Sequence, residues 1–308
     1  MDPSIADTYQ AVQRDLKEYI SKHSSRAIPV GYSAADVRSV LQDTWAYLQC
    51  DINGDSTDLS RSDFFGLNSY SWCGATATYQ SSGYDQLVAM FKDSAIPVFF
   101  SEYGCNLPAG QARVFNEVQA LYGPDMTSLS GGLVYEYSEE PDDYGLVVIA
   151  NNGSINLLQD YINLQNQYDK LNINQLESTT AASSSTNPPA CSSNLISNSS
   201  FSSNFTIPPT PPGGSDLINN GISNPPSGKI ISPGNLDVTF PVYNVTGQQI
   251  TGLSVKSTNS ANTPGDSTTS AQGSSSTKKG DAGRVTATTS ANVAVLAVFA
   301  TLFAFGML

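Results

Sequence analysis

The sequence predicts an α/β fold with parallel strands, on three observations within residues 1–177. Apolar runs rich in aromatic and β-branched residues alternate with segments whose apolar residues recur at helical spacing. The apolar runs begin at Ile28, Phe64, Val98 and Leu133, which are 36, 34 and 35 residues apart. Each run ends in polar or aromatic residues, as in a (β/α)8 TIM barrel, whose chemistry follows the strands. A doubly wound open sheet is the alternative, although no glycine-rich phosphate loop supports it.

The predicted elements follow in a regular order. A helix opens the chain, with Asp2 as its N-cap and Pro3 in its first turn. Its apolar face consists of Ile5, Tyr9, Val12, Leu16 and Ile20. Strands are predicted over residues 27–34, 63–70, 96–103 and 131–138. The helices that follow these strands lie around Val37–Leu48, Tyr84–Phe91, Phe115–Leu121 and Leu157–Leu171.

The composition changes after residue 177. Residues 178–253 are rich in Ser, Thr, Asn and Pro, and we expect a linker and a loop-rich tail that packs on the barrel. Two apolar runs in this tail, "KIIS" and "LDVTFPVYNV", are candidate strands. Residues 254–290 form a Ser/Thr/Gly-rich stalk with almost nothing to bury, which predicts disorder and O-glycosylation.

The C-terminal segment predicts a glycosylphosphatidylinositol (GPI) attachment signal. Residues 291–308 are uncharged and mostly apolar, and a polar spacer and the small-residue cluster "GDAG" precede them. The attachment site is expected at Gly280 or Asp281, and an ordinary tail-anchor helix is the alternative. A GPI anchor places the protein at the cell surface, on the outer side of the plasma membrane or in the cell wall. Four N-glycosylation sequons fit this route: Asn152, Asn198, Asn204 and Asn244.

Charge and cysteine content exclude several classes of function. The formal net charge is −13 and the pI is about 4.3, so nucleic acid is not an expected partner. The four cysteines show no C-x-x-C spacing, which argues against zinc and thioredoxin sites. An even count in an oxidising compartment predicts two disulfides, whose pairing the residues leave open. We expect no metal and no cofactor, and the single histidine excludes a Ser-His-Asp triad.

The candidate catalytic residue is Glu102, which ends the apolar run "IPVFFSEY". A carboxylate at the C-terminal end of a barrel strand can be the nucleophile of a retaining glycosidase. The alternative is a glutamate that forms a salt bridge at the barrel rim. Aromatic rings beside amides and hydroxyls suit sugar binding, because they offer apolar faces and directional hydrogen bonds. Such residues at the other strand ends are Tyr32, Asn68, Tyr70, Trp72, Tyr103, Tyr135 and Tyr137.

Other carboxylates are weaker candidates. The pair Asn116–Glu117 falls in a helical stretch, and we expect it to be solvated or to cap the helix on the outside of the barrel. Glu136, Glu139 and Glu140 end the last strand and are expected to be rim residues. None of them is assigned a catalytic role.

Five motifs resemble a known family: "IPVGYSAAD", "RSDFFGLNSYSWCG", "PVFFSEYGCN", "MTSLSGGLVYEYS" and "YGLV". They are similar to the fungal β-1,3-glucanosyltransferases of glycoside hydrolase family 72, which are GPI-anchored enzymes of the cell wall. The resemblance implies that Glu102 is the nucleophile and that Tyr70 and Tyr135 line glucan subsites beside it. It also implies the disulfides Cys73–Cys105 and Cys50–Cys191.

The resemblance implies transglycosylation between two β-1,3-glucan chains. The enzyme would cleave a donor chain and transfer the new reducing end to the non-reducing end of an acceptor chain. The residues alone do not separate this transferase from an endo-β-1,3-glucanase. A non-catalytic, GPI-anchored wall glycoprotein that binds glucan is an alternative of a different class.

One implication concerns the part of the fold that these residues represent. In the family, an acid/base glutamate ends the fourth strand, ahead of the first strand recognised in this chain. We therefore expect residues 1–177 to be strands five to eight of the barrel, with the signal peptide and the acid/base half ahead of Met1. A retaining mechanism needs two carboxyl groups about 5–5.5 Å apart, so the 308 residues are expected to be inactive by themselves.

Overall fold

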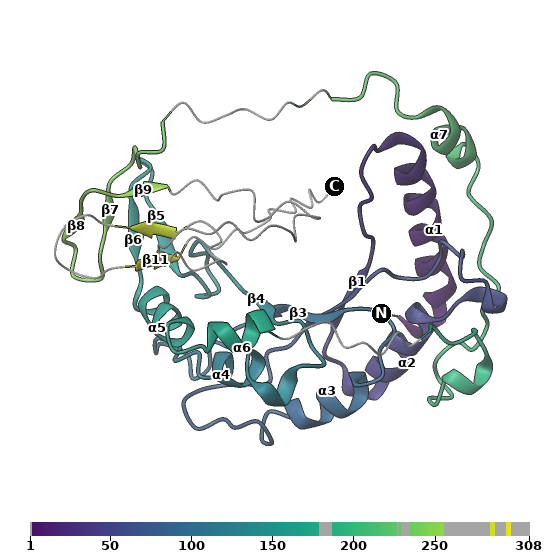
Figure 1. The fold of residues 1–308 in the computed structure, drawn as a ribbon, viewed down its shortest axis with the longest axis horizontal. Helices are drawn as coiled ribbons and strands as arrows, with labels where there is room; N and C mark the ends of the chain where they lie inside the picture. Colours follow the sequence, from purple (N-terminus) through teal and green to yellow (C-terminus); the bar gives the residue numbers. More distant parts are fainter. Residues whose placement is uncertain are drawn as a thin grey trace, which may run out of the picture. The chain divides into compact units, whose positions relative to one another are not determined.

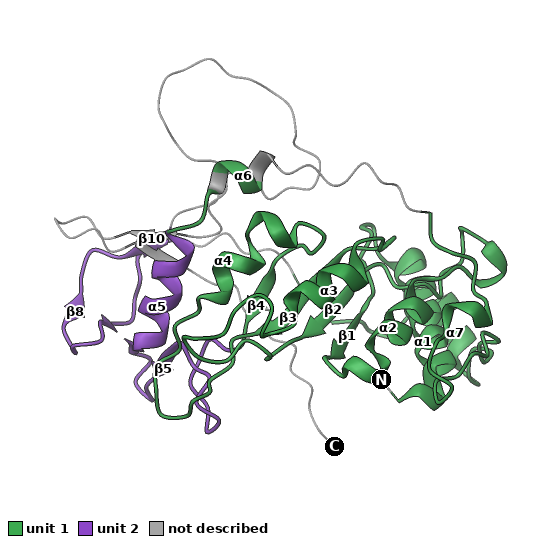
Figure 2. Ribbon diagram, turned by 90° about the horizontal axis from the view of Figure 1, so that it is seen from below, with its two compact units in different colours: residues 1–135, 170–228 green, residues 136–169, 229–308 purple. Residues whose placement is uncertain are grey.

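The computed structural model describes residues 2–178, 187–226, 228, 235–255, 284–286 and 294–296. The chain divides into two compact units (Figure 2). Unit 1 comprises residues 1–135 and 170–228, and unit 2 comprises residues 136–169 and 229–308.

The centre of unit 1 is a four-stranded parallel sheet (Figure 1). Its strands stand in chain order: β1 (Tyr32–Ala35), β2 (Phe65–Asn68), β3 (Val98–Tyr103) and β4 (Gly132–Val134). Neighbouring strands are parallel throughout. Helices connect consecutive strands, because parallel strands need long crossovers. The prediction of an α/β fold with a parallel sheet is therefore confirmed.

The helices α2 (Arg38–Gln49), α3 (Tyr84–Phe91) and α4 (Glu117–Leu121) follow β1, β2 and β3, and they lie on the same side of the sheet (Figure 1). The core between helices and sheet is apolar and fully buried. Its largest side chains include Leu41, Leu48, Phe65, Phe91, Phe100 and Phe115. Short 3-10 helices occur at Ile52–Gly54 (η2) and Pro124–Met126 (η3).

The first helix differs from the prediction in the face that it buries. A short 3-10 helix, η1 (Pro3–Ile5), precedes α1 (Ala6–His23), and the Asp2 side chain caps η1 by accepting from the Ser4 N–H at 2.9 Å. Three residues of the predicted buried face are exposed: Ile5, Val12 and Leu16. The buried face instead carries Ala6, Gln10, Ala11 and Gln13.

Tertiary hydrogen bonds explain why glutamines occupy the buried face of α1. Gln10 Nε2 donates to the Tyr47 carbonyl oxygen at 2.8 Å, and Gln13 Oε1 accepts from the Ser62 hydroxyl at 2.6 Å. A buried polar group is tolerated where such partners exist. Helical spacing of apolar residues does not reveal these partners, so the predicted face was wrong.

The first strand starts later than predicted. Residues 28–31 run beside the segment that precedes β2, where the Asp63 N–H donates to the Val30 carbonyl at 2.8 Å. The Val30 N–H, however, donates to Asp63 Oδ2 at 2.8 Å. A side chain thus takes a hydrogen bond that a regular ladder would give to the backbone, and β1 begins only at Tyr32.

The described part of the tail between residues 187 and 228 packs within unit 1. It contains η4 (Ser193–Leu195) and α7 (Gly214–Asn220), and α7 lies beside α1 (Figure 1). The backbone N–H groups of Ser197 and Asn198 donate to the Asp43 carboxylate of α2 at 2.9 and 2.8 Å. Arg14 Nη1 of α1 donates to the Pro208 carbonyl at 2.8 Å. The helix α6 (Ile173–Ser178) also belongs to unit 1.

Unit 2 has its own small sheet, in the order β5-β6-β7-β8. The strands are β5 (Val147–Ile149), β6 (Ile155–Leu157), β7 (Val242–Tyr243) and β8 (Gln249–Ile250), and α5 (Gln159–Tyr168) follows β6. Of the two candidate tail strands, the run "LDVTFPVYNV" contains β7, which pairs in parallel with β6, whereas "KIIS" lies outside the described residues. Three short antiparallel strands complete the unit: β9 (Ser254–Val255), β10 (Arg284–Thr286) and β11 (Ala294–Leu296).

Candidate active site

A β-bulge in β3 shapes the carboxyl end of the unit 1 sheet. Leu67 of β2 pairs with Phe100 of β3, but the next residue, Asn68, pairs with Glu102. Ser101 is therefore the extra residue of the bulge, and its hydroxyl donates to Asn68 Oδ1 at 2.6 Å. Bulges redirect side chains at strand ends and are frequent beside active sites. The bulge brings Glu102 directly opposite Asn68.

The Glu102 carboxylate is held by Tyr70. The Tyr70 hydroxyl donates to Glu102 Oε2 at 2.7 Å, and the Ser69 N–H donates to the Glu102 carbonyl oxygen at 3.0 Å. Both donors come from the segment that follows β2. The Glu102 side chain is half-buried, so one side of the carboxylate is fixed by protein while the residue remains accessible. In the contacts described here, the Glu102 carboxylate accepts from a tyrosine hydroxyl and forms no salt bridge.

Tyr135 joins this arrangement from the end of β4. Its N–H donates to the Tyr103 carbonyl at 2.9 Å, which continues the β3–β4 pairing beyond the last residue of β4. The rings of Tyr70 and Tyr135 stand edge to face, with centroids 6.4 Å apart and an interplanar angle of 83°. The structure thus gathers Glu102, Asn68, Tyr70 and Tyr135 at one end of the sheet.

Tyr32 does not belong to this group. It is the first residue of β1 and pairs with Phe65, three residues before Asn68 in β2. At about 3.3 Å per residue, this register places Tyr32 roughly 10 Å from the carboxyl end of the sheet. Its ring packs edge to face on Tyr9 of α1, with centroids 5.2 Å apart. Burial, and then Tyr9, raise the pKa of Tyr32 to about 12. Tyr32 thus begins β1 and does not end it, and its sugar-binding role stays a prediction.

A disulfide links the segments that follow β2 and β3. Cys73 and Cys105 are bonded, with their Cα atoms 5.1 Å apart. Cys73 lies three residues after Tyr70, and Cys105 lies three residues after Glu102. The disulfide therefore links the two chain segments that carry the hydrogen-bonded side chains of Tyr70 and Glu102.

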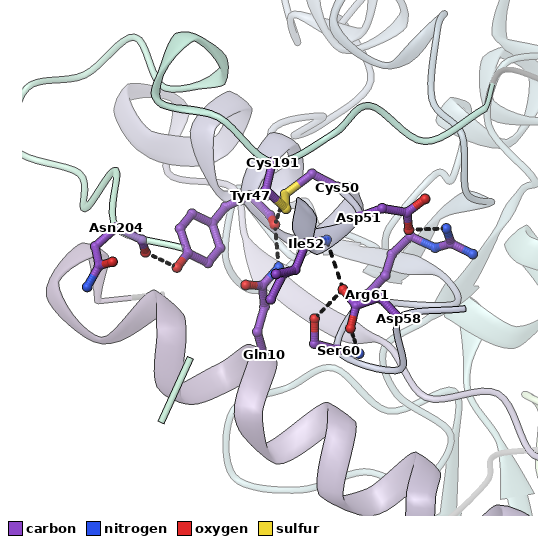
Figure 3. The surroundings of a disulfide bond; sticks show 10 residues. All are labelled: Gln10, Tyr47, Cys50, Asp51, Ile52, Asp58, Ser60, Arg61, Cys191 and Asn204. Atoms are coloured by element: carbon purple, nitrogen blue, oxygen red, sulfur yellow. Dashed lines mark hydrogen bonds and ion pairs between the residues drawn. A yellow bond between two sulfur atoms is a disulfide. The ribbon is translucent and has the colours of Figure 1, made fainter. Parts of the chain in front are cut away.

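The second disulfide, Cys50–Cys191, ties the tail to the end of α2 (Figure 3). The backbone supports it on both sides, since the Asp51 N–H donates to the Pro189 carbonyl at 2.9 Å and the Cys191 N–H donates to the Asp51 carbonyl at 2.8 Å. The Asp51 carboxylate forms an ion pair with Arg61. Both disulfides are the pairings that the resemblance implies.

The residues around this second disulfide are also fixed (Figure 3). The Tyr47 hydroxyl donates to the Asn204 carbonyl in the tail, and the Tyr47 carbonyl accepts from Gln10 Nε2. The Asp58 carboxylate accepts from the Ile52 N–H at 3.0 Å and from the Ser60 hydroxyl at 2.7 Å. These contacts lock the tail and the loop after α2 against α1, and no catalytic candidate lies among them.

A pocket of about 410 Å³ lies beside the first disulfide, between the loops that follow β2 and β3. Its walls include Trp72, Cys73, Cys105, Arg113, Phe115 and Glu117. Glu117 is buried here, 4% exposed, so the expectation of a solvated or capping residue was wrong. The side chain of Asn116 likewise does not cap α4, because it accepts from Trp72 Nε1 at 2.9 Å. Burial raises the pKa of Glu117 to about 7, although its own backbone N–H and Arg113 act in the opposite direction.

Two polar residues near the site escaped the sequence analysis. Asp36 directly follows β1 and accepts a hydrogen bond of 2.9 Å from the Ser69 hydroxyl, next to Tyr70. Arg113 lies in the loop before α4 and donates to the carbonyl groups of Gly104 and Tyr135. A carboxylate at a strand end was a usable signal for Asp36. No local pattern marks a loop arginine that turns inward, so Arg113 could not be found this way.

The predicted modification sites are placed in part. The side-chain oxygens of Asn152, Asn204 and Asn244 accept from the backbone N–H two residues later, at 3.0 Å in each case. Asn198 differs, since its Nδ2 also donates to the Ser39 carbonyl at 3.0 Å. Gly280 and Asp281 lie outside the described residues, as does most of residues 291–308. In the described part of the chain, no helix has the length and apolar character needed to cross a bilayer.

The rim glutamates have local roles within unit 2. Glu139 Oε2 accepts from the Gly145 N–H at 2.6 Å, which closes the turn before β5. Glu140 is exposed. The one contact described here, that of Glu139, is local to the turn before β5.

Comparison with known proteins gives a consistent result. A family model described as glucanosyltransferase matches residues 3–172. The 1,3-beta-glucanosyltransferase gel2 of Aspergillus fumigatus is 46% identical over 259 residues, which are 83% of this chain and 53% of that protein. The probable 1,3-beta-glucanosyltransferase GAS3 of Saccharomyces cerevisiae is 42% identical over 238 residues, 75% of this chain and 45% of that protein. The chain thus spans about half the length of these curated relatives.

Solved structures agree with the sequence relatives. Saccharomyces cerevisiae Gas2p in complex with laminaritetraose and laminaripentaose is 37% identical, with a TM-score of 0.55 over 68% of this chain and 44% of that one. A complex of Gas2 with another compound gives a TM-score of 0.57 at 36% identity, over 70% of this chain and 47% of that one. The chain therefore belongs to the glucanosyltransferase family, glycoside hydrolase family 72.

Proposed function

We propose that this chain carries the nucleophile of a retaining β-1,3-glucanosyltransferase, and that Glu102 is that nucleophile. The observation that carries the proposal is the hydrogen bond of 2.7 Å from the Tyr70 hydroxyl to Glu102 Oε2. One carboxylate oxygen is held by this bond, which directs the other oxygen toward a substrate at the carboxyl end of the sheet. Asn68 opposite Glu102 and the edge-to-face ring of Tyr135 supply hydrogen-bonding groups and apolar surface for sugar rings.

The proposed reaction has two displacements at one carbon. Glu102 attacks the anomeric carbon of a β-1,3-glucan, the glycosidic bond breaks, and the leaving oxygen takes a proton from an acid group. A hydroxyl at the non-reducing end of a second chain then attacks the same carbon, gives its proton to that group, and releases Glu102 as a carboxylate. Two inversions retain the configuration and lengthen the acceptor. The proposal assigns no residue of this chain to the acid/base role.

The substrate class follows from the same site. Two Tyr rings at the strand ends can bind acceptor sugar in place of water, which a transferase requires. The complex of Gas2p with laminaritetraose and laminaripentaose supports β-1,3-glucan as both donor and acceptor. In this proposal β1 to β4 are strands five to eight of a (β/α)8 barrel, formed by residues 1–177.

The proposal extends to the location of the protein. Residues 178–253 are the linker and tail, residues 254–290 are a stalk, and residues 291–308 direct GPI attachment at Gly280 or Asp281. The two disulfides fit an oxidising route to the cell surface. Release of the native protein from fungal membranes by a phosphatidylinositol-specific phospholipase tests this location, and a protein that stays in the membrane fraction contradicts it.

The test of activity uses the native full-length protein released from fungal membranes, and measures by mass spectrometry the size distribution of its products from a reduced β-1,3-glucan oligosaccharide. We expect products both shorter and longer than the substrate. Glu102→Gln should abolish both while the circular dichroism spectrum is unchanged, and Glu18→Gln on α1 is the matched control that should retain both. If only shorter products form, the protein is an endo-β-1,3-glucanase and not a transferase. Binding of the oligosaccharide without any product would make the chain a glucan-binding wall glycoprotein.

A further inference from the structure

Arg113 is a buried cation that contacts the end of the strand carrying the proposed nucleophile. It lies in the loop between β3 and α4, and the residue is only 5% exposed. Its side chain forms part of the wall of the 410 Å³ pocket next to the Cys73–Cys105 disulfide. Burying a guanidinium is costly unless strong acceptors surround it, so its contacts indicate a specific role.

One nitrogen of Arg113 joins the ends of two neighbouring strands. Nη1 donates to the Gly104 carbonyl at 3.1 Å and to the Tyr135 carbonyl at 2.8 Å. Gly104 follows the last residue of β3 and lies two residues after Glu102, whereas Tyr135 follows the last residue of β4. Each strand end therefore has one carbonyl oxygen fixed to the same NH₂ group. Hydrogen bonds from a charged donor are about twice as strong as those between neutral groups.

The surroundings of Arg113 leave it little freedom. Its guanidinium carbon lies 4.7 Å from the centre of the Phe115 ring, a cation–π contact. Phe115 itself has a φ of 51°, a strained conformation for a bulky residue, which tertiary contacts must hold. Gly104 has a φ of 115°, and a Cβ there would lie 3.2 Å from Arg113 Nη1. The backbone is thus arranged to bring the guanidinium against both carbonyls.

Regular pairing between β3 and β4 is interrupted close to this point. The register shifts between Phe100 and Tyr103, so backbone hydrogen bonds alone hold the two strand ends less firmly. Arg113 adds a bridge beyond this irregularity, next to the bond from the Tyr135 N–H to the Tyr103 carbonyl. Its removal would free the ends of β3 and β4 to separate, and with them the Glu102 carboxylate and the Tyr135 ring.

We propose that Arg113 is a positioning residue, which fixes Glu102 relative to Tyr135 by bridging the carbonyl groups of Gly104 and Tyr135. This inference rests on the proposed function. Arg113 acts through the backbone and is not assigned to contact substrate. Loss of the bridge should therefore lower turnover more than substrate binding, because it misplaces the nucleophile without removing a sugar-binding group.

The test compares Arg113→Ala with Arg113→Lys in the native full-length protein, with Arg26→Ala, an exposed arginine, as the matched control. We expect Arg113→Ala to lower kcat by about 100-fold, the scale of a misplacement near 1 Å, with KM changed less than threefold. Ethylguanidine can enter the space left in the pocket, and it should restore kcat of Arg113→Ala at least tenfold without affecting Arg26→Ala. Arg113→Lys, which keeps a cation able to reach one carbonyl, should lie between the wild type and Arg113→Ala.

Several results would overturn the proposal. An Arg113→Ala chain that keeps kcat within threefold excludes a positioning role, and so does a loss that neither ethylguanidine nor the lysine variant relieves. If the wild-type native protein turns over no glucan, the proposed function fails, and amide exchange then decides the positioning. The Tyr135 amide should exchange at least tenfold faster in Arg113→Ala and recover its protection with ethylguanidine. Unchanged exchange refutes the bridge.

Discussion

The hydroxyl of Tyr70 donates a hydrogen bond of 2.7 Å to Glu102 Oε2, and the disulfide Cys73–Cys105 lies three residues beyond each partner. The two chain segments are thus joined twice, by the hydrogen bond between these side chains and by the disulfide three residues further along. The proposed nucleophile needs a fixed direction of approach to the anomeric carbon, and these two restraints would supply it.

Tyr70→Phe removes only the hydroxyl. We expect kcat to fall by about 10–100-fold with a small change in KM, because the ring remains while the carboxylate loses its orienting donor. Initial rates on a β-1,3-glucan oligosaccharide measure this. A KM that rises tenfold at constant kcat would instead make Tyr70 a substrate contact alone. Tyr79→Phe, whose hydroxyl donates to the Asp125 carbonyl at 3.3 Å, is the matched control.

The two disulfides should differ in what their removal costs. Cys50–Cys191 closes 141 residues and Cys73–Cys105 closes 32. On the chain-entropy model, removal costs about 5 and about 4 kcal/mol of unfolding free energy, respectively. We expect the double Cys→Ser variant at 50 and 191 to lose more stability in urea unfolding.

Activity should show the opposite order. The Cys73–Cys105 disulfide links the segments that carry Glu102 and Tyr70. At a temperature where both variants are folded, its removal should therefore reduce kcat more than removal of Cys50–Cys191 does. Equal activity losses in the two variants would show that the position of Glu102 relative to Tyr70 does not depend on the Cys73–Cys105 disulfide.

Glu117 should make stability depend on pH. Burial raises its pKa from 4.5 to about 7, so the folded state binds the proton more tightly than the unfolded state does. The contribution of Glu117 to stability is therefore greatest below pH 4.5, is lost as the pH rises through about 7, and is then constant. The total change is about 3 kcal/mol, from roughly 2.5 pH units at 1.36 kcal/mol each.

Glu117→Gln should remove this slope, because the amide does not titrate. Urea unfolding at several pH values between 4.5 and 8 measures it, and the exposed Glu140→Gln is the control that should keep the slope. A wild-type protein whose stability rises over this range would show that other carboxylates dominate the linkage.

Gly104→Ala should be poorly tolerated. The φ of 115° is strained for any residue with a Cβ, and the added carbon would lie 3.2 Å from Arg113 Nη1 and 3.3 Å from the Tyr135 carbonyl oxygen. We expect a loss of about 2 kcal/mol or more in unfolding free energy, together with reduced kcat. Gly110→Ala in the same loop is the matched control, since a Cβ there meets nothing within 4 Å at a φ of 75°. Equal effects at the two positions would mean that backbone strain alone, and not the contact with Arg113, sets the cost.

Much of the site followed from the order of residues along each strand. Glu102, Tyr70 and Tyr135 were identified because parallel strands bring their carboxyl ends to one edge, so a polar residue that ends each apolar run must approach the others. Tyr32 differs from these residues because β1 continues beyond it to Ala35, and it is Ala35 that pairs with Asn68 at the carboxyl end.

The sequence by itself determined the α/β fold, the parallel order of four strands and the motifs that resemble the family. These properties depend on periodicity and on residue types close together in the chain. Only the tertiary structure decided that Glu117 is buried, that glutamines line the inner face of α1, and that Arg113 bridges two strand ends. The reason is physical. A polar side chain is buried where distant segments provide its hydrogen-bond partners, and the residues near it in the sequence do not reveal those partners.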